Sequence, residues 1–299
     1  MASSIYYLTP LLLFFFTSCS TAALVEEQPP LLKYHHGPLL KGTVTVNLLW
    51  YGVFTPARRS IIVDFLESLN STKPPAPSVA SWWRKTERYN GVRGSVAVAA
   101  RQILDDRCSI GKSLKTSQIA SLAAKISSQT GNLISVVLTA DDVRVDGFCM
   151  NRCGTHGSSS ARRPGRFLYA WVGDAGAQCP GFCAWPFHRP AYGPQGPPLV
   201  APNGDVAADG MVVNLAAVLA GAVTNPFSDG YYQGAAAAPV EAVTACAGVF
   251  GKGAYPGYAG EIKTDEATGG SYNAHGVNGR RYLLPAMWDP RTSRCSTVV

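Results

Sequence analysis

DVAADGMVVNLAAVLAGAVTNPFSDGYYQG, residues 205–234, is the stretch that decides the fold. Residues 211–223 carry no charged side chain, which predicts a helix that is buried on every face. Asp209 is predicted to cap the start of this helix, and Asn225-Pro226 to end it. At about 13 to 15 residues the helix is too short for a bilayer, which needs roughly 20. The stretch therefore predicts the central helix of a soluble core.

The flanking sequence predicts strands and helices that alternate. Residues 42–53 (GTVTVNLLWYGV), 94–104, 132–140 (NLISVVLTA) and 166–173 have strand patterns. Helical patterns cover 55–69, 79–89, 113–128 and 239–249, and 271–288 has the form of a hairpin. The expected fold is a single α/β domain, in which a mixed β-sheet and its helices pack around the central apolar helix and disulfides staple the loops.

Composition and charge narrow the class of protein. The chain has 299 residues, 46% of them hydrophobic and 15% charged, so it can bury a large core. The net charge of +7 is spread over short pairs such as Arg58-Arg59, which are typical of a solvated surface, with weak attraction for a polyanion as the alternative. No stripe of Lys and Arg interleaves with aromatics, so a nucleic-acid partner is not expected.

The N-terminus has the features of an export signal. Residues 1–22 hold an apolar run at 11–16 and small residues at a cleavage site near Ala22. No later segment has the length and apolar composition expected of a membrane anchor. We therefore expect a secreted protein of the extracellular space, with a mature domain at 23–299 and no membrane span.

Cysteine usage agrees with secretion. The chain has eight cysteines, and removal of the signal takes Cys19 away and leaves seven, which predicts three disulfides and one unpaired thiol. The disulfide candidates are Cys149, Cys153, Cys179, Cys183, Cys246 and Cys295. Cys246 is the preferred partner of Cys295. The first four cysteines, with His156 and His188, also leave zinc open as an alternative.

Two features concern sugars. Asn70-Ser71-Thr72 is an acceptor sequon for N-glycosylation, at the point where a helix gives way to a proline-rich loop. Trp82 and Trp83 are adjacent on a predicted helix and point about 100° apart. Either ring is a candidate platform for stacking a glycan, and packing in the core is the alternative.

Catalytic motifs are missing from the sequence. It has no HExxH, GxSxG or Walker loop, and no GxGxxG that opens a helix, so no cofactor is expected. Cys108 with His156 or His275 is one conceivable nucleophile pair. A glycosidase would need two facing carboxylates. The candidates are Asp141, Asp142, Asp205, Asp209, Asp229 and Glu241. Such acids also serve as helix caps and in loops.

The central helix offers Asn214, Thr224 and Asn225, none of which acts as a general acid, a general base or an ordinary metal ligand at neutral pH. The sequence therefore predicts that this protein is not an enzyme.

Long motifs along the mature chain resemble the plant EXORDIUM and EXORDIUM-like proteins, also called phosphate-induced protein 1. The motifs are YHHGPLL (34–40), NLLWYG (47–52), DFLESLN (64–70), SVASWWRKTERY (78–89), GFCMNRCGTHGS (147–158), QCPGFCAWPFHRPAYGPQGPPLVAPNGDVAADGMVVNLA (178–216), TNPFSDGYYQG (224–234), GAYPGYAG (253–260) and SYNAHGVNGRRYLLPAMWDPRTSRCSTVV (271–299). The resemblance implies a secreted protein of the cell wall or apoplast that promotes cell expansion and growth and is linked to brassinosteroid and carbon-status responses. It implies no enzymatic activity and no catalytic residues.

Residues 218–232 also resemble a bacterial group of zinc-peptidase-like proteins, whose helix reads HELAEAVTDP. Aligned on Thr224 and Pro226, the His and Glu of that group fall on Ala217 and Val218, its later Glu on Gly221, and its Asp on Asn225. This resemblance implies a degenerate zincin-like fold that has lost its metal site. The expected function is non-catalytic binding of a cell-wall polysaccharide or a cell-surface receptor. An extracellular hydrolase that acts on wall glycans through loop carboxylates is the alternative.

Overall fold

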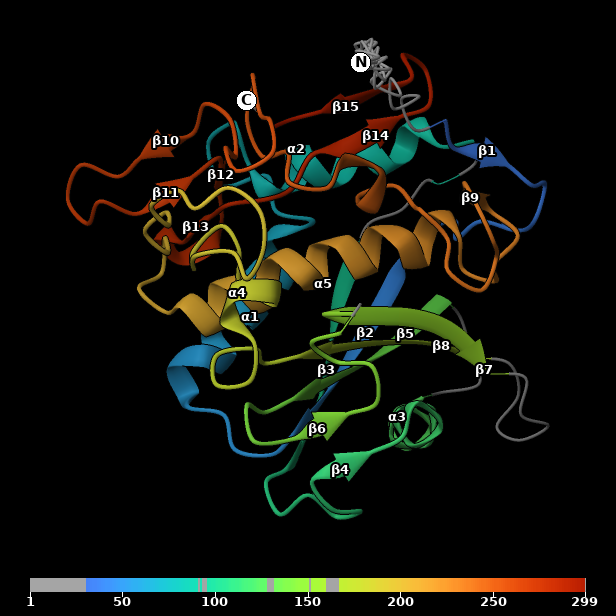
Figure 1. The fold of residues 1–299 in the computed structure, drawn as a ribbon. Helices are drawn as coiled ribbons and strands as arrows, with labels where there is room; N and C mark the ends of the chain where they lie inside the picture. Colours follow the sequence, from blue (N-terminus) through green and yellow to red (C-terminus); the bar gives the residue numbers. More distant parts are fainter. Residues whose placement is uncertain are drawn as a thin grey trace, which may run out of the picture.

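The computed structural model describes residues 31–90, 92, 96–127, 132–150, 152–159 and 167–298. The predicted signal peptide at 1–22 lies outside these residues. A five-stranded mixed sheet, in the order β3-β2-β5-β8-β7, forms the centre of the fold (Figure 1). Its strands are β2 (Val44–Tyr51), β3 (Val96–Asp105), β5 (Asn132–Thr139), β7 (Gly154–Ser159) and β8 (Phe167–Gly173).

Four of these strands are parallel, and β7 is an antiparallel edge strand beside β8. The sequences of β2 and β5 turn almost continuously apolar because helices cover both faces of the sheet, and both strands are buried over nearly their whole length. The mixed α/β class predicted from the sequence is confirmed.

Helices α1 (Pro56–Ser68) and α3 (Thr116–Ala124) lie on opposite faces of the sheet. α1 contacts β3 and the long helix α5, whereas α3 contacts β5 and β8. The chain moves from β2 outward to β3 and then back past β2 to β5. Because crossovers between parallel strands are almost always right-handed, this change of direction is expected to place the two helices on opposite faces.

Helix α5 (Val206–Thr224) runs between the sheet and the two-stranded ribbons within residues 263–296, which we call the C-terminal ribbons, as Figure 1 shows. It contacts β8, β7 and α1, and 15 of its residues are buried, as expected for a helix that is apolar all round. The helix ends where the sequence predicts, with Asn225 as its C-terminal cap before Pro226.

Two predictions about this helix were wrong. The cap at its start is Asp205, whose Oδ1 accepts from the backbone N–H groups of Ala207 and Ala208, so Asp209 falls inside the first turn. The helix is therefore 19 residues long, which length and composition alone would allow to cross a membrane. Its 78% buried share, rather than its length, assigns it to the core of this fold.

Short elements surround this framework. The helical ones are α2 (Val79–Trp83), α4 (Pro180–Cys183) and the 3₁₀ turns η1 (Arg84–Arg88), η2 (Thr244–Cys246) and η3 (Val277–Gly279). The two-stranded ribbons pair β1 (Lys33–Tyr34) with β9 (Tyr231–Tyr232), β4 (Ser113–Leu114) with β6 (Arg144–Val145), β10 (Lys263–Thr264) with β11 (Ser271–Tyr272), β12 (Ala274–His275) with β13 (Arg281–Tyr282), and β14 (Met287–Asp289) with β15 (Arg294–Ser296).

The hairpin predicted over 271–288 is confirmed at its turn, where β12 pairs with β13 around 276–280. Its outer parts are not paired with each other, since β11 pairs with β10 and β14 with β15. The helix predicted over 239–249 is wrong, since only the 3₁₀ turn η2 forms there. Val240 instead pairs with Gln233 in an antiparallel bridge, and Gly248 has a positive φ of 77°. The bridge keeps the start of the predicted helix extended, and the positive φ of Gly248 lies outside the helical region near its predicted end.

Three disulfides staple the loops: Cys149–Cys179, Cys153–Cys183 and Cys246–Cys295. The first two join the segment before β7 to α4, and the third ties η2 to β15 at the C-terminus. Cys108 is the one free cysteine among the described residues, and it is buried. All six candidates are therefore paired, and the sulfurs considered for zinc are held in disulfide bonds.

Candidate functional site

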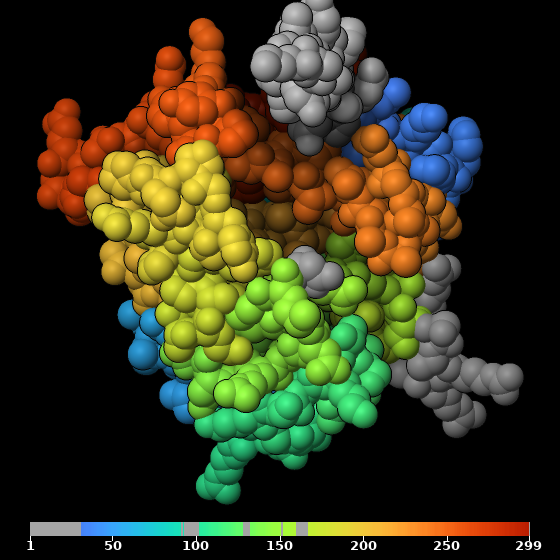
Figure 2. Space-filling model, viewed as in Figure 1, coloured from blue at the N-terminus to red at the C-terminus, as the bar shows by residue number. Residues whose placement is uncertain are grey.

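A cleft of about 610 Å³ opens over the middle of α5. In the sequence-coloured surface of Figure 2 it is the hollow where the gold-brown atoms of α5 lie behind walls from the green and orange segments. Its lining residues are Arg152, Cys153, Gly154, Thr155, His156, Asn214, Ala217, Val218, Ser228, Ala236, Ala237, Ala238, Pro239, Glu241 and Thr244. We call this the α5 cleft. Its volume falls within the range of about 300–1,000 Å³ that is usual for small-ligand sites.

Three parts of the fold build the α5 cleft. Helix α5 supplies the floor with Asn214, Ala217 and Val218, and β7 and the residues before it supply one wall. The opposite wall is the segment 236–244, which the Gln233–Val240 bridge holds in place. Ala217 and Val218 give the cleft an apolar floor, and the amide of Asn214 beside them donates to the carbonyls of Cys183 and Gly210.

Two ionisable side chains of the cleft pair with each other. Nε2 of His156 lies 2.9 Å from Oε2 and 3.0 Å from Oε1 of Glu241. The amide of Asn225 donates to Oε1 at 2.7 Å, while its own Oδ1 accepts from the N–H of Gly230. Asn225 thus joins the end of α5 to this pair, and the three side chains connect β7, α5 and the wall at 236–244.

Gly221 makes room for the His156–Glu241 pair. A Cβ atom at this position would lie 2.7 Å from both Oε2 of Glu241 and Nε2 of His156. Any other residue would therefore displace the pair from the surface of the helix. Glycine inside a helix costs about 1 kcal/mol of stability relative to alanine. At position 221 this cost is offset because only glycine leaves space for the two side chains.

The pair is enclosed, and its reactive atoms are engaged. The side chains of His156 and Glu241 are only 10% and 13% exposed. Nδ1 of His156 is buried and has no hydrogen-bond partner among the described residues. A general acid or base must reach the proton that it transfers. Nε2 of His156 is bonded to Glu241 and its Nδ1 is buried, and the pair links β7 to the wall at 236–244.

Arg152 lines the cleft, and its guanidinium forms no ion pair with an acidic side chain of the described residues. Its positive charge is felt at the neighbouring Tyr169, where burial raises the pKa of the phenol and the guanidinium opposes that rise. A guanidinium has five N–H donors in a planar fork that matches a carboxylate or phosphate. Arg152 is therefore the group in this cleft that is suited to an anionic ligand.

The tryptophans predicted as a glycan platform do not serve as one. Trp82 and Trp83 are 0% and 4% exposed, and the indole N–H of Trp82 donates to the carbonyl of Pro285 at 2.8 Å. Both rings are buried because α2 is enclosed between α1 and the C-terminal ribbons. The stacking prediction is wrong, and the core alternative holds. Asn70 is exposed at the end of α1, and its glycosylation stays a prediction.

The candidate carboxylates are largely engaged in the structure. Asp205 caps α5 and forms an ion pair with Arg58 at 2.8 Å, and Asp142 pairs with Lys112. Asp141 lies near Arg58, and one carboxylate oxygen of Asp229 is buried without a hydrogen-bond partner among the described residues. Of the six, only Glu241 lines the α5 cleft.

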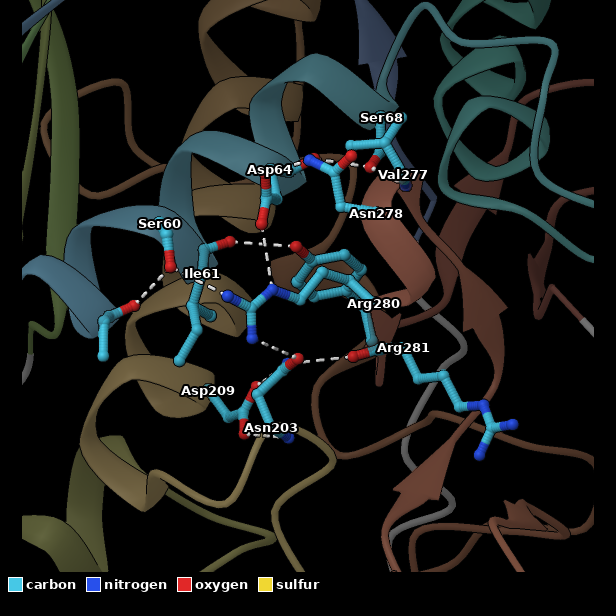
Figure 3. Close-up of polar contacts among 12 residues, drawn as sticks. Ser60, Ile61, Asp64, Ser68, Asn203, Asp209, Val277, Asn278, Arg280 and Arg281 are labelled. Carbon is cyan, nitrogen blue, oxygen red and sulfur yellow. Dashed lines mark hydrogen bonds and ion pairs between the residues drawn. The ribbon is translucent and has the colours of Figure 1, made fainter.

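Figure 3 shows how Asp209 is held. Its two oxygens accept from the backbone N–H and the amide of Asn203, at 2.9 and 2.6 Å. Beside it, Asp64 accepts from Arg280 and Asn278 at 2.9 and 2.8 Å. Burial raises the pKa of Asp209 to about 7, although the bonds from Asn203 oppose the rise. These acids connect α1, the start of α5 and the C-terminal hairpin.

The proposed cysteine nucleophile is not assembled with His156. Cys108 follows β3 and His156 lies on β7, at opposite edges of the sheet. Burial also raises the pKa of the Cys108 thiol, which disfavours the thiolate. His275 lies on β12 in the C-terminal hairpin, next to Pro77 in the loop before α2. Sequence reasoning named His156 and Glu241 separately but missed their pairing, because 85 residues separate them.

Comparison with known proteins gives a consistent result. A family model described as the phosphate-induced protein 1 conserved region matches residues 32–298. Protein EXORDIUM-like 2 of Arabidopsis thaliana is 58% identical over 274 residues, covering 89% of each chain. Protein PHOSPHATE-INDUCED 1 of Nicotiana tabacum is 56% identical over 277 residues, covering 89% of this chain and 88% of that protein. Protein EXORDIUM of Arabidopsis thaliana is 55% identical over 282 residues, covering 89% of each.

No solved structure matches the chain. The expected zincin-like ancestry therefore has no support from a known fold.

Proposed function

The chain belongs to the phosphate-induced protein 1 family of growth-related plant proteins, and on this basis we propose that it acts outside the cell, in the wall or apoplast, by binding an anionic wall polymer without catalysis. The growth role would be promotion of cell expansion in brassinosteroid and carbon-status responses. Three disulfides among the described residues and the export signal predicted at 1–22 support an oxidising, extracellular location.

One observation carries the choice of ligand: Arg152 lines the α5 cleft and forms no ion pair with an acidic side chain of the described residues. Pectic polymers carry uronic acids, whose carboxylates match a guanidinium. The protein as a whole has a net charge of +7, which favours the approach of any polyanion. A cell-surface receptor is the other partner that the sequence predicted, and nothing in the cleft favours it over the polymer.

The chemistry of the cleft supports binding over catalysis. The floor positions Ala217 and Val218 offer no group that could bind or activate water. Glu241 hydrogen-bonds to both His156 and Asn225, and these bonds connect three parts of the fold. Loss of a metal site from a zincin-like ancestor would explain such a cleft, and we propose that ancestry on the sequence resemblance alone.

The experiment is retention of the purified protein on immobilised polygalacturonate, measured against salt concentration, for the wild type and two variants. Arg152→Ala removes the cleft cation. Arg189→Ala removes an exposed cation outside the cleft and is the matched control for net charge. We expect retention that weakens with salt, that Arg152→Ala reduces about tenfold, and that Arg189→Ala barely changes. Equal retention of all three proteins would reject the cleft as the site.

Hydrolysis of wall glycans is the competing function, and it predicts that the protein releases sugar products with new reducing ends. Incubation of the protein with pectin, xylan and β-glucan, followed by measurement of new reducing ends, separates the two. Release that Glu241→Gln abolishes would replace the binding proposal with a catalytic one.

A further inference from the structure

We propose that a second site, distant in sequence from Arg152, stacks the ring of a neutral sugar. It is a groove between the loop 185–199 and the turn at 255–258, with a volume of about 220 Å³. Trp185, His188 and Tyr258 line it together with prolines such as Pro197 and Pro198. We call it the aromatic groove. It is independent of the α5 cleft and does not rest on the proposed function.

A tight turn presents Tyr258, which lines the groove, and Tyr255 beside it. In Tyr255-Pro256-Gly257-Tyr258 the N–H and carbonyl groups of the two tyrosines bond to each other, at 3.0 and 2.8 Å. Proline followed by glycine suits the two central positions, and Gly257 has the positive φ of 89° that a type II turn requires. The two rings consequently lie together, with centroids 5.1 Å apart.

The turn is fixed against the opposite loop. A Cβ atom on Gly257 would lie 2.6 Å from the Cβ of Pro194, so only glycine allows this approach. In Figure 2 the yellow segment that includes this loop meets the orange segment of the turn. Beneath the groove, Trp185 packs on Phe250 in a small separate core. The groove is therefore preformed, which reduces the entropy lost on binding.

The aromatic side chains of this region are exposed despite their apolar surface. Tyr255 is 65% exposed and Tyr258 is 40% exposed, in a protein that buries Trp50, Trp82 and Trp171 almost completely. Exposed aromatic rings that cluster on a rigid surface mark binding sites rather than packing. A tyrosine ring also combines a flat apolar face with a hydroxyl at its tip.

Charge and size select a sugar ring as the occupant. No Asp, Glu, Lys or Arg is among the residues that line the aromatic groove, so an anionic ligand gains nothing there. The volume lies below the range of about 300–1,000 Å³ for sites that enclose whole ligands, and it suits one ring of a longer chain. The C–H face of a pyranose can stack on an aromatic ring while its hydroxyls stay at the edge.

His188 supplies a polar group at this edge. Its Nδ1 lies 2.9 Å from the carbonyl of Arg189, which can only accept, so Nδ1 carries the hydrogen. In the neutral ring Nε2 is then an acceptor for a sugar hydroxyl. Together these features assign the groove to a neutral oligosaccharide.

The test is calorimetric titration of the protein with a neutral β-1,4-linked gluco-oligosaccharide. Intrinsic tryptophan fluorescence is a second signal, to which Trp185 in the groove contributes. Tyr258→Ala removes the ring that lines the groove. Tyr192→Ala is the matched control, since Tyr192 is 82% exposed and does not line the groove. We expect saturable binding at both low and high salt, about tenfold weaker in Tyr258→Ala and unchanged in Tyr192→Ala.

Three outcomes would overturn the proposal. These are no saturable binding by the wild type, equal binding by Tyr258→Ala, and binding of a polyproline peptide in place of the sugar. The third would assign the groove to proline-rich peptides, which also dock on aromatic surfaces. Retention on polygalacturonate, which depends on salt and on Arg152, is measured in a separate experiment. A negative result for one site therefore does not affect the test of the other.

Discussion

Replacement of Asp209 by asparagine should change how the stability of this protein depends on pH. Asp209 lies in the first turn of α5, is 2% exposed, and accepts two hydrogen bonds from Asn203. Arg280 is the nearby cation and Asp205 the nearby anion that act on it. Asparagine has nearly the same shape as the protonated acid but does not titrate.

The magnitude follows from the pKa. Burial raises the pKa of Asp209 from 3.8 to about 7 in the folded protein. The folded state therefore binds an additional proton between these two values, and its stability increases as the pH falls through this window. At about 1.4 kcal/mol for each pH unit, the contribution is about 4 kcal/mol, fully present below pH 4 and lost above pH 7.

The assay is urea unfolding of the purified protein at a series of pH values from 4 to 8, followed by tryptophan fluorescence. We expect the difference in unfolding free energy between Asp209→Asn and the wild type to shift in favour of the variant by about 4 kcal/mol across this range. Glu266→Gln, which removes an exposed carboxylate, is the control for loss of one acid.

The same difference at pH 4 and pH 8 would refute the reasoning, because it would mean that Asp209 has equal proton affinity in the folded and unfolded states. A shift of the opposite sign would also refute it. In that case the hydrogen bonds from Asn203 and the charge of Arg280 would outweigh the cost of burial.

Three further predictions concern stability, each measured by urea unfolding. Gly221→Ala should cost about 1–3 kcal/mol, because the new methyl group displaces the His156–Glu241 pair, and an unchanged midpoint would show that the pair can move aside. Replacing Cys246 and Cys295 together by alanine should cost about 4 kcal/mol, from the 49-residue separation that the bridge closes, and a loss under 1 kcal/mol would contradict this entropic argument. Trp82→Phe should lower the free energy of unfolding by about 1–3 kcal/mol, because it leaves the buried carbonyl of Pro285 without its donor. Unchanged stability would contradict this prediction and would mean that a water replaces the indole N–H.

Elements with a clear local pattern were predictable from the sequence. The strands at 132–140 and 166–173 agree with β5 and β8 to within a residue or so, since continuous apolar runs have one stable environment. Thr55-Pro56 marked the start of α1 correctly, and the hydroxyl of Thr55 accepts from the N–H of Arg58. The number of disulfides and of free thiols was also predictable by counting cysteines.

Predictions failed where several local solutions were available. Both Asp205 and Asp209 can cap a helix, and the choice of Asp205 depends on Arg58 and on the Asn203 amide that binds Asp209. The segment 239–249 has the small residues of a helix, but pairing of Val240 with Gln233 stabilises an extended chain. Tertiary contacts override weak propensities in such cases.

The sequence by itself determined that α5 is buried, that the loops are bridged and that the helix lacks catalytic side chains, because composition and spacing express these properties directly. Only the tertiary structure decided that Trp82 is buried while Tyr258 is exposed, and that Gly221 makes room for His156 and Glu241. The physical reason is that burial and pairing depend on which distant segments cover a residue. That information lies in the packing of the sheet, α5 and the C-terminal ribbons.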